Sequence, residues 1–435
     1  MSEAQREEAP AWAPKVSPVW TFAGLALGVV LGIALQGRAA LPALLPVAQA
    51  VGDLWLHALQ LTIVPLVAAL LVTGIQQIAA AAQGGRTARA TLALFLTLLA
   101  IGGVAGALLT PLLLGTFPIP AAAVEALGGS KGAVNDVALP TLADYLDTLV
   151  PTNIVAAAAE QKMLGLIVFF ALLGTAISRL PTRLRLPLAD LFEGLAAAML
   201  VVIGWILALA PLGVLALAFA FAGKAGTTAI GALLHYILIV SAVGAVCVVI
   251  AYLLAVFAGG QRFGAFARAL LPVQAVALAT QSSLASLPAM LAACRELGVR
   301  ERSADFVLPL AVALFRMTSP TMNLAVVIYV AQLTGTPLPP AMLALGVVVA
   351  VLANFSTVSL PGTISYVTTI APIALAMGVP IGPLGLLVAV ELLPDLMRTV
   401  GNVASDTAVA TVIDRRYGRE PGSGAQPSAS SSRQR

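Results

Sequence analysis

The last long helical segment of the chain, residues 391–406, carries a line of polar and charged side chains in an otherwise apolar protein. At about 100° per residue they all fall within roughly 100° of arc on one helical face, along about 22 Å. This polar stripe consists of Glu391, Asp395, Arg398, Thr399, Asn402 and Asp406. A charged side chain at the centre of a bilayer costs about 2.5–3.5 kcal/mol even on the mildest scale. The stripe must therefore face protein, water or a ligand, as a ladder of ion pairs between helices or as a binding site at membrane depth.

The composition is that of a polytopic membrane protein. Hydrophobic residues make up 60% of the chain and charged residues 10%, with a mean hydropathy of +1.00, whereas a soluble domain has about 25% charged residues. The net charge of +4 does not indicate nucleic-acid binding, because the basic residues lie in short loops and the tail.

The sequence contains no pattern typical of a metal centre, a cofactor site or an active site. Cys247 and Cys294 lie in apolar or helical context, where cysteine packs as a small hydrophobic residue. His57 and His235 stand alone, far in sequence from the polar stripe. No Ser/His/Asp set or catalytic dyad is recognisable, so we do not expect an enzyme.

Two apolar segments, residues 269–293 and 341–377, are interrupted by polar turns that share Ser-Leu-Pro, at 286–288 and 359–361. Each segment is long enough for two half-helices that meet at a tip. Broken backbone at membrane depth must be buried in protein or line a cavity, and paired interruptions indicate a transporter site. The alternative is two ordinary helices kinked by proline. The uninterrupted apolar runs predict spans at residues 18–37, 41–80, 90–115, 151–178, 186–222, 228–258 and 303–333, followed by the polar-striped helix, which ends near Asp414.

The distribution of Lys and Arg predicts the orientation. Eight spans with two re-entrant hairpins put both termini on one face. On that face lie 17 of the 23 Lys and Arg residues, four lie on the other face, and Arg316 and Arg398 are intramembrane. This imbalance predicts a multi-pass protein of the inner membrane with a cytoplasmic N-tail (1–17) and a disordered cytoplasmic C-tail (415–435).

From residue 18 to 414 the chain resembles the dicarboxylate/amino acid:cation symporter family, the glutamate transporters. The family pattern D-x-x-R-T-x-x-N-V-x-x-D is matched by Asp395, Arg398, Thr399, Asn402, Val403 and Asp406. The serine-rich tip of the family's first hairpin is matched by Thr280, Ser282, Ser283, Leu287 and Pro288, and the tip of the second by Leu360, Pro361 and Gly362. The resemblance implies an all-α fold of eight transmembrane helices and two re-entrant hairpins with inverted repeats, assembled as a homotrimer.

The resemblance also implies an elevator mechanism, in which a mobile unit carries the site across a fixed scaffold. The scaffold would comprise residues 18–85 (spans 1–2) and 117–226 (spans 4–5). The transport domain would comprise residues 86–116 (span 3) and 227–414, which contain span 6, both hairpins and spans 7–8.

Carried over to this sequence, the resemblance implies a role for each site residue. Asp395 would take the ammonium group of the substrate, and Arg398 would hold a side-chain carboxylate with its planar fork of donors. The further substrate-binding residues would be Ser282, Ser283, Ser319, Leu360, Pro361, Gly362, Thr399 and Asn402. The acid at Asp395 favours amino acids as substrates, and the arginine at Arg398 favours acidic ones.

One departure concerns cation coupling. Where the family's seventh span has Asn-Met-Asp-Gly-Thr, an ungapped alignment places Phe315, Arg316, Met317, Thr318 and Ser319, and an alignment with a one-residue gap places Arg316, Met317 and Thr318 at Asn-Met-Asp. A sodium-binding carboxylate is thereby lost and an arginine is gained. We hypothesise that Arg316 acts as a tethered cation near Asp406, in a coupling site with Asn402. Alternatively, Arg316 binds a substrate carboxylate or is purely structural.

The sequence therefore predicts a secondary active transporter for glutamate or aspartate, with no organic cofactor and with Na⁺ or H⁺ as the coupling ion. We expect sodium coupling to be reduced or absent, with proton coupling or exchange in its place. The alternatives are a symporter of C4-dicarboxylates or other organic anions, and a substrate sensor or channel built on the same fold without transport.

Overall fold

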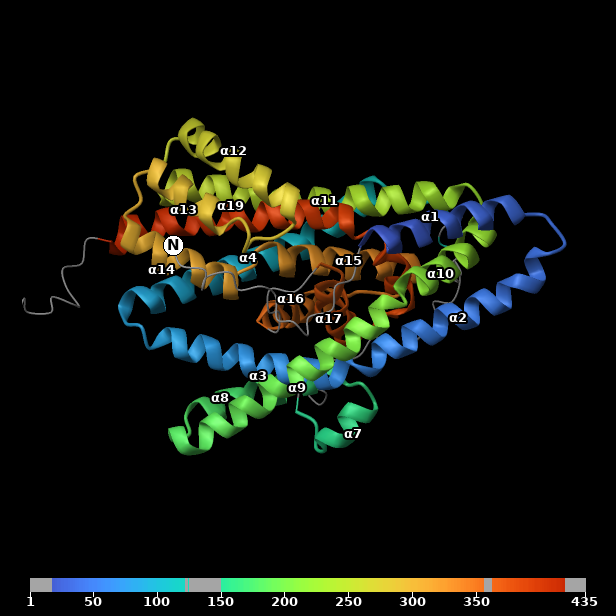
Figure 1. Cartoon of the computed structure of the whole chain (residues 1–435), viewed down its shortest axis with the longest axis horizontal. Helices are drawn as coiled ribbons and strands as arrows, with labels where there is room; N and C mark the ends of the chain where they lie inside the picture. Colours follow the sequence, from blue (N-terminus) through green and yellow to red (C-terminus); the bar gives the residue numbers. More distant parts are fainter. Residues whose placement is uncertain (1–17, 122–123, 125–149, 356–361, 419–435) are drawn as a thin grey trace, which may run out of the picture.

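The computed structural model describes residues 18–121, 124, 150–355 and 362–418, and every regular element within them is helical (Figure 1). The predictions for Leu360 and Pro361 lie outside the described residues, as do those for residues 1–17 and for the tail beyond residue 418. The predicted all-α class is confirmed for the part of the chain that is described.

The helices follow one another along the chain with short connections. The first half contains α1 (Pro18–Leu35), α2 (Leu41–Leu61), α3 (Ile63–Ala82), α4 (Arg86–Thr116), α7 (Ile154–Ala159), α8 (Met163–Ser178), α9 (Thr182–Ala208) and α10 (Ala210–Ala225). The second half contains α11 (Thr228–Leu253) with a π-helical end η2 (Leu254–Ala258), α12 (Phe263–Thr280), α13 (Leu287–Glu296), α14 (Glu301–Leu314), α15 (Thr318–Thr334), α16 (Pro340–Asn354), α17 (Gly362–Ala376), α18 (Gly382–Leu387) and α19 (Leu392–Tyr417).

Six helical segments of the described residues are long and apolar enough to cross a membrane. They are Leu41–Ala82, Arg86–Thr116, Thr182–Ala208, Thr228–Ala258, Phe263–Thr280 and Glu301–Thr334. Shorter apolar helices, including α1, α8, α10 and α16, lie between them. This is the architecture of a polytopic membrane protein, and the finer division into eight spans and two re-entrant hairpins stays a prediction.

Two of the predicted spans are interrupted just before a proline. A proline has no N–H group, and its ring collides with the carbonyl four residues earlier. The second span accordingly breaks at Thr62, three residues before Pro65. The predicted span over residues 303–333 corresponds to the candidate span Glu301–Thr334 and is interrupted in the same way: residues 315–317 are not helical, and Pro320 lies in the first turn of the helix that follows.

Both interrupted apolar segments form pairs of helices. In the first, α12 and α13 pack against each other and are joined by residues 281–286, which are not helical. In the second, α16 and α17 pack together on either side of residues 356–361, which lie outside the described residues. For the first segment the alternative of a single kinked helix is therefore wrong.

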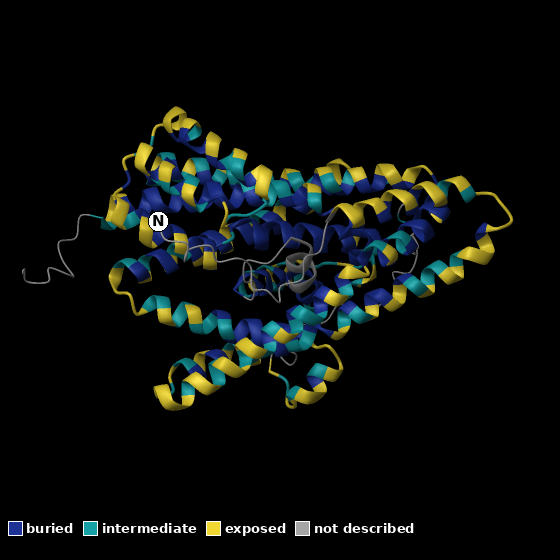
Figure 2. Cartoon of the chain, in the orientation of Figure 1, coloured by how far each residue is buried: buried dark blue, intermediate teal, exposed yellow. Residues whose placement is uncertain are grey.

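The helices bury two apolar cores. One is formed by α4 and α11–α14 together with α19, and the other by α1–α3 and α8–α11 together with α15–α18. Helix α15 belongs to one core and α19 to the other, and the two helices contact each other. Figure 2 shows both mostly in the colour of buried residues. In α15 all residues except Gln332 and Thr334 are buried. Most polar side chains on these two helices therefore lie inside the protein rather than in lipid.

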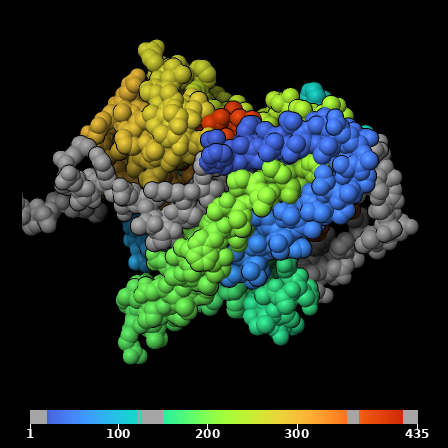
Figure 3. Space-filling view, turned by 45° about the vertical axis from the view of Figure 1, so that its right-hand side comes forward, coloured from blue at the N-terminus to red at the C-terminus, as the bar shows by residue number. Residues whose placement is uncertain are grey.

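Close backbone contact ties α1 to α10. Gly24, Gly28 and Gly32 recur once per turn on α1 and face α10. A Cβ atom at Gly28 would lie 2.5 Å from the carbonyl oxygen of Leu215, and one at Gly32 would lie 2.7 Å from that of Phe219. Figure 3 shows α10 and α9 running diagonally beside α1 and α2. Only glycine allows this approach, which packs α1 and α10 as one unit.

Candidate functional site

The site is built where the interrupted seventh predicted span meets α19. The carbonyl of Leu314, at the end of α14, accepts a hydrogen bond from Nδ2 of Asn354 at 3.0 Å. On the other side of the break, Oδ1 of Asn402 accepts from the backbone N–H of Thr318 at 3.2 Å and from its hydroxyl at 2.8 Å. Side chains of α16 and α19 thus satisfy backbone groups that a continuous helix would have paired.

The polar stripe of α19 faces the protein interior, as its periodicity predicted. Glu391, Asp395, Thr399, Asn402 and Asp406 are all buried, with between 0% and 9% of their surface exposed. On the opposite face Leu393 is 43% exposed.

Arg398 is the centre of the charged cluster. Its Nη2 atom lies 2.6 Å from Oε1 of Glu391, and its Nε atom lies 3.3 Å from Oδ1 of Asp395. Its Nη1 atom donates to Oδ1 of Asn323 at 2.8 Å. The ion pairs therefore form within α19 and with Glu391, the residue that precedes it, and not as a ladder between helices.

The cluster extends into two neighbouring helices. Tyr236 of α11 donates its hydroxyl hydrogen to Oε2 of Glu391 at 3.0 Å. On α15, Nδ2 of Asn323 donates to Oγ of Ser319 at 3.2 Å. Ser319 thus belongs to the same network as Arg398, through Asn323.

Asp406 is the one acid of the stripe outside this network. It is 0% exposed, and neither of its carboxylate oxygens has a hydrogen-bond partner among the described residues. Arg316, in the break between α14 and α15, interacts electrostatically with Asp406 and with Asp395.

The position at which the resemblance places a sodium-binding asparagine is filled by an aromatic ring. Phe315 is fully buried and stacks on Phe95 of α4, with ring centroids 4.6 Å apart and planes 5° apart. Met317, in place of the expected acid, is also fully buried. Over the described ranges, no three His, Cys, Asp or Glu residues gather in a way that could hold a metal ion.

Thr399 and Asn402 make their contacts within the protein. The hydroxyl of Thr399 donates to the backbone carbonyl of Asp395 at 3.0 Å. Asn402 uses its side-chain oxygen to hold Thr318. Asn402 therefore positions the interrupted helix, which is a role that the sequence did not predict.

Of the residues at the two predicted hairpin tips, the structure describes those of the first, whereas Leu360 and Pro361 of the second lie outside the described residues. Ser282 accepts a hydrogen bond from the N–H of Ala285 at 3.2 Å, and its carbonyl accepts from Ser286 at 2.8 Å, so its bonds stay within the tip. Ser283 is half-buried beside it. The arms α12 and α13 contact α19, as does α17, which begins at Gly362.

Sequence reasoning missed several residues of the network. Asn323 lies four residues after Ser319, so helical spacing places both on one face of α15. Glu391 was placed in the stripe but given no role in the site. Tyr236 and Asn354 lie in apolar runs, and their spacing carries no signal of a contact with α19 or α14.

Interrupted helices with a buried cluster of charges, in a chain with several membrane-spanning helices, define a membrane transport protein rather than an enzyme. The chain belongs to the Sodium:dicarboxylate symporter family, whose sequence model matches residues 18–416.

Three relatives illustrate the range of this similarity. The Proton/sodium-glutamate symport protein of Bacillus subtilis is 26% identical over 410 residues, which cover 91% of this chain and 92% of the relative. The Proton/glutamate-aspartate symporter of Escherichia coli is 26% identical over 368 residues, or 83% of each chain. The C4-dicarboxylate transport protein of Brucella anthropi is 25% identical over 383 residues, which cover 85% of this chain and 83% of the relative.

Proposed function

We propose that this protein is a secondary active transporter for an acidic amino acid, aspartate or glutamate. The observation that carries the proposal is the guanidinium of Arg398, whose side chain is 13% exposed, beside the carboxylate of Asp395, 3.3 Å from Nε to Oδ1. An acidic amino acid carries a carboxylate for the first and an ammonium group for the second. Relatives named as glutamate symporters support the same substrate class.

Other site residues would complete the substrate contacts. Ser282, Ser283, Leu360, Pro361 and Gly362 would come from the two hairpin tips, Ser319 from α15, and Thr399 and Asn402 from α19. Free backbone N–H groups at the starts of the half-helices would suit the main carboxylate of the substrate. A C4-dicarboxylate is the second candidate substrate, because dicarboxylate transporters are among the relatives.

Cation coupling would be modified by Arg316. Its electrostatic interaction with Asp406 supports the role of a tethered cation that replaces one bound ion. The stacking of Phe315 on Phe95 supports the loss of a sodium ligand at position 315. The coupling ion would then be H⁺, or transport would proceed as exchange.

The test is uptake of labelled aspartate and glutamate into liposomes that hold the purified protein. A sodium gradient, a proton gradient and no gradient are compared. We expect uptake that is indifferent to sodium and is driven by protons or seen only as exchange. Sodium-driven uptake would contradict the coupling proposal. Binding without flux would indicate a sensor, non-saturable flux a channel, and the absence of both would refute the substrate class.

The packing of the helices supports the proposed division into a scaffold and a transport domain. Helix α4 lies far from α15 and α16 in sequence, yet it packs against both and also contacts α11 and α19. This favours residues 86–116 as part of the transport domain. Helices α1, α2 and α10 pack together, and α3 packs against α8 and α9, as a scaffold would. The homotrimer and the inner membrane with cytoplasmic termini remain part of this proposal.

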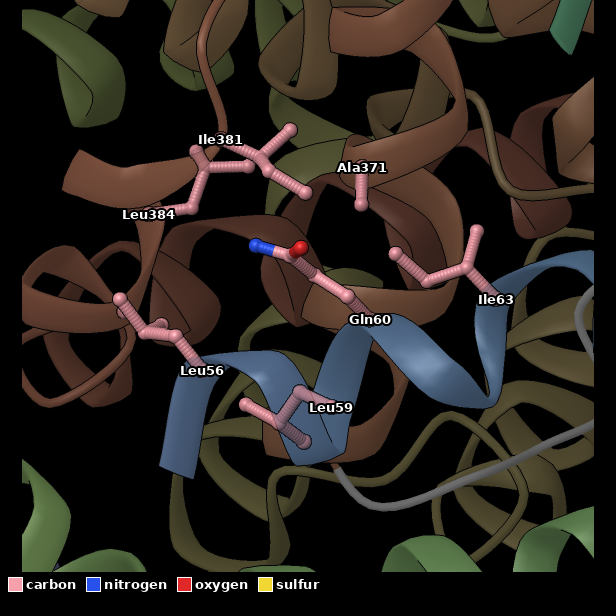
Figure 4. A pocket seen from close by; sticks show the side chains of 8 residues that line it. Leu56, Leu59, Gln60, Ile63, Ala371, Ile381 and Leu384 are labelled. Carbon is pink, nitrogen blue, oxygen red and sulfur yellow. The ribbon is translucent and has the colours of Figure 1, made fainter. Parts of the chain in front are cut away.

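An elevator movement would separate contacts between the two units. Gly385 of α18 lies so close to α2 that a Cβ atom there would strike the side chain of Leu56. Beside it lies an apolar pocket between α2–α3 and α17–α18, into which Gln60 of α2 points (Figure 4). The contacts across this pocket are apolar. Among the described residues no hydrogen bond crosses it.

A disulfide between Leu56→Cys and Gly385→Cys is therefore expected to arrest uptake, because it ties the proposed mobile unit to the scaffold. Both native cysteines are buried, so oxidation would act on the introduced pair. Uptake is measured before oxidation, after it and after reduction, which should restore transport. Each single variant serves as control. Full uptake by the cross-linked protein would refute a movement between these two helices.

A further inference from the structure

Arg398 already holds a carboxylate of the protein itself. Besides the 2.6 Å pair with Arg398, Glu391 accepts a hydrogen bond from Tyr236, so each of its two carboxylate oxygens has a partner. The side chain of Glu391 is only 3% exposed. Arg398 and Tyr236 thus form a built site for a carboxylate, and Glu391 fills it.

The remaining nitrogen atoms of Arg398 are also engaged, with Asp395 and with Asn323. A second carboxylate that is to pair with the guanidinium in a two-pronged geometry must therefore displace one of these acceptors. Asp395 is the proposed partner of the substrate ammonium group, and Asn323 is neutral and tied to Ser319. Glu391 is the remaining anionic acceptor, and it resembles a substrate side-chain carboxylate in charge and geometry.

We propose that Glu391 is a specificity-determining residue, a tethered carboxylate that competes with the substrate's side-chain carboxylate for Arg398. The inference rests on the proposed function. Tyr236 strengthens this competitor, because its hydroxyl holds the second oxygen of Glu391. A substrate gains the Arg398 contact only if its own carboxylate replaces that of Glu391, so a carboxylate at the wrong distance is rejected.

The competing explanation is that Glu391 only orients Arg398 and neutralises its charge. The two explanations predict opposite changes in affinity. If Glu391 orients the guanidinium, its removal weakens binding of acidic amino acids. If it competes, its removal strengthens their binding and leaves unchanged any ligand that lacks a side-chain carboxylate.

The experiment measures the Kd for aspartate, glutamate and asparagine by calorimetry on the purified protein in detergent. For Glu391→Gln we expect the Kd for the acidic amino acids to fall roughly tenfold or more, on the scale of one charged hydrogen bond. Glu391→Asp keeps the charge but shortens the side chain, so its Kd should fall by less. Tyr236→Phe should act in the same direction, and the weaker affinity for asparagine should not change.

Glu193→Gln, an exposed acid of α9, is the matched control for loss of a carboxylate, and thermal unfolding of each variant confirms that it is folded. An unchanged or raised Kd in Glu391→Gln and Glu391→Asp overturns the inference while leaving the proposed function intact. A gain in Glu391→Gln alone would indicate a change in overall charge and would also overturn it. If the wild type and all folded variants bind neither acidic amino acids nor succinate, the proposed function fails as well.

Discussion

Replacing Arg398 by alanine is expected to abolish binding and uptake of aspartate and glutamate. The guanidinium is the proposed partner of the substrate side-chain carboxylate, and it also compensates Glu391 and Asp395. Removing one member of a buried charge pair costs about 3–5 kcal/mol, because the other charge remains buried and unpaired. We therefore expect a lower temperature of unfolding together with loss of binding, measured by thermal shift and calorimetry.

A second variant separates these two effects. Arg398→Ala combined with Glu391→Gln removes one of the unpaired charges and should recover much of the thermal stability. Binding of acidic amino acids should stay lost, because the donor fork is absent. Arg398→Lys keeps the charge without the planar fork and should bind weakly. Acidic amino-acid binding by the folded double variant would show that Arg398 is structural.

Replacing Arg316 by methionine is expected to make substrate binding dependent on an added monovalent cation. Asp406 is fully buried without a hydrogen-bond partner among the described residues, and Arg316 is the cation that acts on it. Without Arg316 this carboxylate is uncompensated, at a cost of about 3–5 kcal/mol, or roughly 100- to 4,000-fold in affinity. The Kd for aspartate, measured in choline chloride and in sodium chloride, should differ for the variant and agree for the wild type.

The double variant Arg316→Met with Asp406→Asn is the control for this experiment. It removes both charges, so binding should again become independent of sodium. Together with the wild type and the single variants Arg316→Met and Asp406→Asn, it completes a double-mutant cycle. If Arg316→Met changes the choice of substrate but not the cation dependence, Arg316 contacts the substrate instead. If it changes neither, Arg316 is structural and both functional hypotheses fail.

Much of the fold and part of the site could be predicted from the sequence. Helical spacing placed Glu391 and Asp406 on one face of a helix, and the cost of charge in lipid required that this face be buried, as it is. The interruption around Ser286 predicted the helix pair α12–α13. Pro320 is the sequence signal for the break between α14 and α15, because proline interrupts a helix. Hydropathy alone predicts the segment as one span.

The partners of these residues could not be predicted in the same way. Tyr236 contacts Glu391 across 155 positions of sequence, and Phe315 stacks on Phe95 from another helix. Such contacts depend on how whole helices pack, and hydropathy reports only whether a face is buried. The same limit applies to Arg398, which is predicted to bind a substrate carboxylate and is paired in the structure with Asp395 of its own helix and with Glu391, the residue just before that helix.

The sequence by itself determined the class of the protein, the positions of its apolar helices and the face of α19 that carries the charges. These follow from local chemistry: the length of the apolar runs, helical periodicity, the interruption of helices by proline, and the cost of placing a charged group in lipid. Only the tertiary structure decided which charges meet, because pairing requires two side chains to be within about 4 Å. It joined Arg398 to Glu391 and Asn323 and left Asp406 apart. It did so because the packing of α11, α15 and α19 brings residues of distant sequence into contact.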